Sequence, residues 1–122
     1  MKKLLSILLA AMMVLSLVSV ASADVADFDP ELVAAAKEDG ELVVYGSCEE
    51  PYVAAAAKQF EALFGIKTTY QRLSTGEVQT KITEENGNPS ADVWFGGTND
   101  PYNECAKDGL LMAYEATNAK HL

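Results

Sequence analysis

Three short apolar runs recur along the chain, and each is followed by a polar loop and then by an amphipathic segment. Residues 42–45 (LVVY) form a β-rich run that is too short for a helix and lies between two glycines. Residues 66–73 alternate apolar and polar positions, which is typical of a half-exposed strand at or near a sheet edge. Residues 91–95 form the third run. We therefore predict three β-strands.

The segments between these runs have helical spacing. From Pro51 onward, apolar residues recur at intervals of three and four up to Gly65, and we interpret them as a stripe that packs on the sheet rather than as a ligand pocket. The predicted helices span residues 29–39, 51–64, 77–85 and 101–107. Alternating strands and helices predict an α/β fold, a mostly parallel sheet with flanking helices in three layers.

The N-terminus has the pattern of a secretory signal peptide over residues 1–23. Lys2 and Lys3 precede an apolar stretch over residues 4–20, and Ala21-Ser22-Ala23 is a small-residue cleavage site. The alternative is a transmembrane anchor, because the apolar stretch approaches the length of a membrane span. We favour cleavage near Ala23, export through the Sec route of a bacterium, and a periplasmic or extracellular domain over residues 24–122.

The charge balance excludes some classes of partner. The net charge is −9, and removal of the leader with its two lysines would make the remaining chain more acidic. Such a chain would be repelled by nucleic acid and by anionic membranes. Its length allows one small domain with a modest core.

Polar loops follow all three predicted strands. In a parallel sheet these loops share the carboxyl edge, where open α/β sheets bind ligands. Ser74 and Glu77 match a capping box, so that loop is either a helix cap or, compatibly, an anion site built from backbone N–H groups. The candidate ligand-binding residues are Ser47, Cys48, Ser74, Thr75, Gly76, Gly97, Thr98 and Asn99.

Catalytic chemistry has little support in the sequence. The single histidine is His121, and neither a G-x-S-x-G elbow nor a phosphate-binding glycine motif is present. Glu49 and Glu50 can be read as a carboxylate pair, but we favour first-turn helix acids. We predict a binding protein rather than an enzyme, with no cofactor and no metal site.

Cys48 and Cys105 are the only cysteines. An even pair in an exported chain favours a disulfide. The two residues would share one rim if their strands are neighbours in the sheet. We predict a Cys48–Cys105 disulfide, with two free thiols as the alternative.

Four segments together resemble the type II periplasmic solute-binding proteins of ABC importers, in the group that receives ferric iron, phosphorylated sugars and phosphonates. They are residues 40–47 (GELVVYGS), 60–67 (FEALFGIK), 89–95 (PSADVWF) and 108–111 (DGLL). The resemblance implies a sheet with the first strand between the second and third. It also implies ligand contacts from the loops around Ser47, Ser74 to Gly76 and Gly97 to Asn99.

Members of this group are longer and two-lobed, so the resemblance covers the first part of the N-terminal lobe, and we expect a fragment. Iron-binding members place a His-Tyr or similar pair in the first loop and often a glutamate in the third. Cys48-Glu49-Glu50 and Gly97-Thr98 occupy those places here, which does not support ferric coordination by this half.

We therefore expect a monomeric receptor that delivers a small oxyanion-bearing solute to a membrane permease. The alternatives are a receptor for ferric iron or an iron chelate, an exported enzyme on a similar lobe, and a small adhesion or structural domain.

Overall fold

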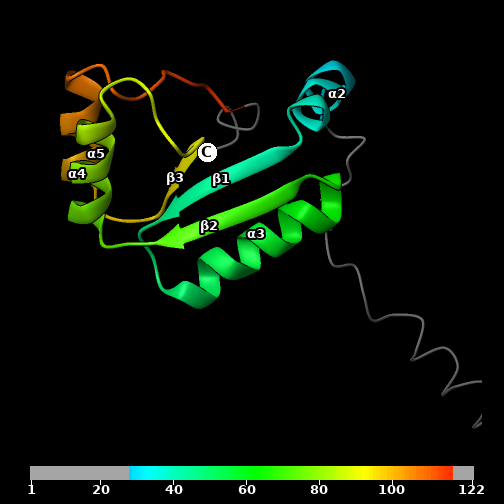
Figure 1. Cartoon of the computed structure of the whole chain (residues 1–122), viewed down its shortest axis with the longest axis horizontal. Helices are drawn as coiled ribbons and strands as arrows, with labels where there is room; N and C mark the ends of the chain where they lie inside the picture. Colours follow the sequence, from blue (N-terminus) through cyan, green and yellow to red (C-terminus); the bar gives the residue numbers. More distant parts are fainter. Residues whose placement is uncertain (1–27, 117–122) are drawn as a thin grey trace, which may run out of the picture.

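The computed structural model describes residues 28–116. The elements in chain order are α2 (Pro30–Asp39), β1 (Glu41–Gly46), α3 (Glu50–Phe64), β2 (Lys67–Arg72), α4 (Thr75–Glu85), β3 (Val93–Phe95) and α5 (Asn99–Lys107) (Figure 1). Each strand and helix predicted from the sequence is present, and no boundary differs by more than two residues. The proposed signal peptide lies outside the described residues.

The sheet is parallel and has the order β2-β1-β3 in the described part of the chain. This result confirms the α/β class, the place of β2 at an edge and the sheet order implied by the resemblance. In the register, Gly46 pairs with Arg72 on one side and with Phe95 on the other. The three strands therefore end level, and the three loops leave from the same edge.

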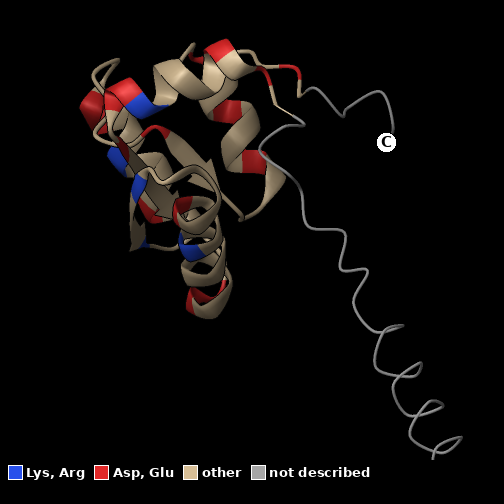
Figure 2. Ribbon diagram, turned by 90° about the vertical axis from the view of Figure 1, so that its right-hand side faces the viewer, with Lys and Arg blue, Asp and Glu red and all other residues tan. Residues whose placement is uncertain are grey.

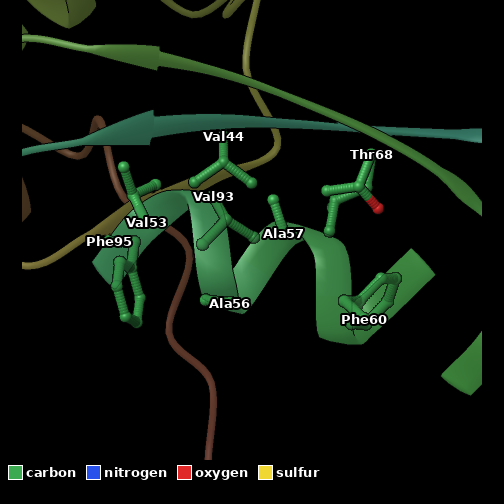
Figure 3. Close-up of a pocket in the computed structure, with 9 residues that line it drawn as sticks. Val44, Val53, Ala56, Ala57, Phe60, Thr68, Val93 and Phe95 are labelled. Carbon is green, nitrogen blue, oxygen red and sulfur yellow. The ribbon is translucent and has the colours of Figure 1, made fainter. Parts of the chain in front are cut away.

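Helices pack on both faces of the sheet, with α3 on one side and α4 and α5 on the other. Figure 1 shows α3 running alongside β2, and α4 and α5 near the ends of β1 and β2. The alternation of β1 sends successive side chains into the two layers. Val44 points toward Val53 and Ala57 of α3, as Figure 3 shows. Tyr45 belongs to the opposite cluster, which also contains Val78, Ile82 and Cys105.

A pocket of about 270 Å³ lies between α3 and the sheet (Figure 3). Its lining is apolar apart from Thr68. Val93 and Phe95 of β3 border this pocket and are 43% and 41% exposed, so this face of the sheet is incompletely covered by the described residues. The pocket has few groups that would recognise a charged solute.

A polar cluster joins β1 to α4. The Tyr45 hydroxyl donates to Glu85 Oε1 at 2.7 Å, and Lys81 Nζ lies 3.4 Å from the same oxygen. Burial raises the pKa of Glu85, but hydrogen bonds from Tyr45, Ser90 and Lys81 outweigh it, and the pKa lies below its ordinary value. Glu85, at the end of α4, is therefore stabilised as a carboxylate.

Among the helices of residues 28–116, none is both long enough and apolar enough to span a membrane.

Candidate ligand-binding site

Three loops converge at the carboxyl edge of the sheet. A Cβ added to Gly97, after β3, would lie 2.9 Å from Thr75 Oγ1 and 3.1 Å from Ser47 Cβ. Gly97 also has a φ of +105°, which residues with a Cβ rarely adopt. Ser47, Thr75 and Gly97, which the sequence placed in separate loops, are thus brought together, and glycine permits their close approach.

The hydroxyl of Ser47 is the part of this residue that remains for a ligand. Its backbone N–H donates to the Phe95 carbonyl at 2.8 Å and so extends the pairing of β1 with β3. Its Oγ accepts a hydrogen bond from Trp94 Nε1 at 2.8 Å.

Trp94 is held in turn by Tyr102 of α5. The two rings are stacked, with centroids 3.9 Å apart and planes 19° from parallel. The Tyr102 hydroxyl lies 2.6 Å from the Gly96 carbonyl and 3.1 Å from the Trp94 carbonyl, to which it can donate. Burial, with a further contribution from Cys48, raises the pKa of Tyr102 to about 12, so this phenol remains a donor at neutral pH. The sequence analysis did not select either aromatic residue.

Cys48 lies against the third loop and next to a cation. A Cβ on Gly96 would lie 2.9 Å from Cys48 Cβ, so these two loops also touch. The Cys48 carbonyl accepts a hydrogen bond from Arg72 Nε at 3.2 Å. Arg72 is the only arginine of the sequence, ends β2 and is exposed on this rim. The sequence analysis missed it, although a lone arginine before a polar loop was an available signal.

The loop after β2 contains the predicted capping box. Glu77 N–H donates to Ser74 Oγ at 3.3 Å, and Ser74 N–H donates to Glu77 Oε2 at 2.7 Å. The Ser74 hydroxyl is thus used to cap α4, whereas Thr75 and Gly76 are the first two residues of the helix. Their N–H groups are the donors that an α-helix leaves without intrahelical partners.

Thr98 and Asn99 lie at the start of α5. Thr98 is the N-cap residue but its side chain makes no capping hydrogen bond, and Asn99 is the first helical residue rather than a loop residue. Both are exposed. Neither side chain has an observed contact with Ser47 in the described part of the chain, so their part in a site stays a prediction.

The electrostatics of the rim are mixed. Each of the three helices that begin there has an acidic residue in its first turn, namely Glu50, Glu77 and Asp100. Acidic residues are also spread along the rest of the helices, whereas basic residues are few (Figure 2). Glu77 is turned back toward Ser74, and hydrogen bonds from the Ser74 side chain and backbone hold the pKa of Glu77 below its ordinary value. Arg72 is therefore the group that offsets negative charge at this edge.

The structure differs from the predicted disulfide, because Cys48 and Cys105 are both free thiols. Their surroundings differ as well. Cys105 is 1% exposed and is enclosed with Tyr45, Val78 and Ile82, whereas Cys48 is half-buried in the loop against Gly96. Cys48 does lie at the rim of the sheet, but α5 directs the Cys105 side chain into the hydrophobic cluster.

Within residues 28–116, no group of three or more His, Cys, Asp and Glu side chains is arranged to hold a metal ion.

Comparisons with known proteins identify similar chains. No protein-family model matches the sequence. An uncharacterized protein of Haemophilus influenzae is 38% identical over 87 residues, which cover 71% of this chain and 24% of that protein. The periplasmic binding protein AfuA of Actinobacillus pleuropneumoniae, solved with exogenous fructose-6-phosphate bound, is 43% identical with a TM-score of 0.63. The periplasmic binding protein P5PA is 30% identical with the same TM-score.

The two solved structures are matched over 65% of this chain and 25% of theirs. The chain thus spans about a quarter of the length of the relatives that it matches. Its parallel sheet and flanking helices are those of a lobe of the periplasmic binding proteins.

Proposed function

We propose that this chain is part of an exported solute-binding receptor for an ABC importer, and that its loops hold an oxyanion group of the solute. The observation that carries the proposal is the convergence of Ser47, Thr75 and Gly97 at one rim of a parallel sheet, beside Arg72. Hydroxyls, first-turn N–H groups and a guanidinium are the groups with which proteins bind phosphate and carboxylate.

The comparisons support a phosphorylated solute. AfuA, whose structure contains fructose-6-phosphate, shares 43% of the matched residues with this chain. In this proposal the chain supplies one side of a site that closes around the solute, a membrane permease receives the solute, and no step of catalysis is involved. The periplasmic names of both structural relatives support a location outside the cytoplasmic membrane.

Thermal unfolding of the secreted chain tests the proposal. We expect fructose-6-phosphate to raise the melting temperature and fructose to leave it unchanged. A ligand at ten times its dissociation constant stabilises the folded state by about 1.4 kcal/mol, and such a gain raises the melting temperature of a domain of this size by roughly 6–11 °C. If phosphate and carboxylate esters have no effect but ferric ion stabilises strongly, the oxyanion proposal is wrong and the iron alternative is favoured.

A matched pair of charge variants tests the role of Arg72. Arg72→Gln removes the cation at the rim, whereas Lys58→Gln removes one from an exposed position on α3. Both variants change the net charge equally. We expect only Arg72→Gln to weaken fructose-6-phosphate, by roughly tenfold, because a charge-assisted hydrogen bond is lost. Equal losses of affinity in the two variants would mean that Arg72 contributes only through the net charge.

A further inference from the structure

We infer that Trp94 is a positioning residue, which fixes the Ser47 hydroxyl as a hydrogen-bond donor and so selects an unprotonated oxyanion as its acceptor. The inference rests on the proposed function, because it concerns the same site. We place Ser47, and not Trp94, in contact with the solute. The solute class is that of phosphate esters and carboxylates.

The first step is the direction of the Trp94–Ser47 hydrogen bond. An indole N–H can only donate, so Ser47 Oγ must be the acceptor in the 2.8 Å contact. A serine hydroxyl has one proton, and that proton must then point to another acceptor. Among the described residues, none is recorded as accepting a hydrogen bond from Ser47 Oγ.

The second step is that Trp94 has little freedom to turn away. Its ring is stacked on Tyr102 at 3.9 Å, and Tyr102 is anchored through its hydroxyl to the carbonyls of residues 94 and 96. Both carbonyls can only accept, so Tyr102 must donate. The direction of both sets of hydrogen bonds is therefore fixed: Tyr102 donates to backbone carbonyls, and Trp94, which is stacked on Tyr102, donates to Ser47.

The direction of these hydrogen bonds determines which ligand groups Ser47 can bind most strongly. The Ser47 side chain lies beside Gly97 and Thr75, at the point where the loops meet. A ligand oxygen there can accept the Ser47 proton, and a phosphate or carboxylate oxygen does so more strongly than a sugar hydroxyl. A ligand group that donates to Ser47 Oγ would have to use the second lone pair of that oxygen, because the indole N–H occupies the first.

A double-mutant cycle tests the inference in the full chain. Trp94→Phe preserves an aromatic ring against Tyr102 but removes the N–H, and Ser47→Ala removes the hydroxyl. We expect each single variant to bind fructose-6-phosphate about 5- to 20-fold more weakly than the wild type. Because Trp94 acts through Ser47, we expect Trp94→Phe to have little further effect when Ser47→Ala is already present. Additive losses would mean that Trp94 has only a packing role, and the inference would be overturned.

A measurement on the unaltered chain covers the case in which a variant fails to fold. Trp94 is the only tryptophan, so its indole N–H gives one resonance in the NMR spectrum. We expect fructose-6-phosphate to shift this resonance, because the hydrogen bond strengthens when Ser47 donates onward, and fructose to leave it in place. Stabilisation by fructose-6-phosphate without a shift would refute the inference alone. If neither a shift nor stabilisation occurs, the proposed function fails and the inference fails with it.

Discussion

Replacing Gly97 with alanine tests whether the three loops are held as closely as the structure places them. The new Cβ would lie 2.9 Å from Thr75 Oγ1, 3.0 Å from Thr75 Cγ2 and 3.1 Å from Ser47 Cβ. The Thr75 side chain can rotate, but Ser47 Cβ moves only with its backbone, which is hydrogen-bonded to Phe95. The loop of Ser47 must therefore shift, and the site must open.

The backbone adds a second cost that a control variant can separate. A residue with a Cβ at a φ of +105° is strained by about 1–3 kcal/mol. Gly87 also has a positive φ, +83°, but nothing lies within 4 Å of a Cβ added there. Gly87→Ala therefore reports the strain of a left-handed backbone, about 1–2 kcal/mol, without the close contacts.

The assay is thermal unfolding of wild type, Gly87→Ala and Gly97→Ala, each with and without fructose-6-phosphate. One kcal/mol corresponds to roughly 4–8 °C in a domain of this size, so we expect Gly87→Ala to melt clearly lower and Gly97→Ala to melt lower still. We expect only Gly97→Ala to lose the stabilisation by ligand. If Gly97→Ala retained that stabilisation, the three loops would not form the binding site in the way we argue.

Three further predictions concern stability and thiol chemistry. The pKa of Glu77 is lowered in the folded state, so its contribution to stability is complete above its ordinary pKa and is lost as the pH falls through the folded value. We therefore expect Glu77→Gln to reduce the loss of stability on acidification. Thermal unfolding measured from pH 6 to pH 3 checks this. We expect Tyr45→Phe to lower the free energy of unfolding by about 1–2 kcal/mol in urea, because the partly buried Glu85 carboxylate loses a donor. We expect a thiol reagent to modify Cys48 quickly in the unreduced chain and Cys105 slowly, because burial, Asp108 and Glu104 raise the pKa of Cys105.

Each of these predictions has a control or a contradicting result. Glu38→Gln removes an exposed carboxylate of α2 for which no hydrogen bond is recorded, and we expect it to leave the acid dependence as in the wild type. Tyr70→Phe changes an exposed tyrosine of β2 and should leave the urea midpoint unchanged. Two unreactive cysteines in the folded, unreduced chain, both released by reductant, would mean that the disulfide forms after all.

Features that depend on neighbouring residues were predictable from the sequence. Four letters, Ser74 to Glu77, predict a capping box, and both of its hydrogen bonds are present. The first helix was predicted to end at residue 39, and it does so, followed by Gly40 with a φ of +80°. The alternation over residues 66–73 predicted an edge strand, which β2 is. In each case the controlling interaction lies within one turn or one strand, so the local pattern determines the outcome.

Features of the site that depend on register were not predictable in this way. Arg72 is one exposed residue of an alternating strand, and only its pairing with Gly46 brings it to the rim beside Cys48. Trp94 meets Ser47 across 47 positions of sequence. The disulfide was expected from an even cysteine pair in an exported chain and from a shared rim, but the rotation of α5 about its axis decides where the Cys105 side chain points. Strand order brings loops to one edge, whereas register and helix rotation decide which side chains meet there. When an oxyanion site is inferred from loop composition, register and helix rotation must therefore be known before any donor in the site can be named.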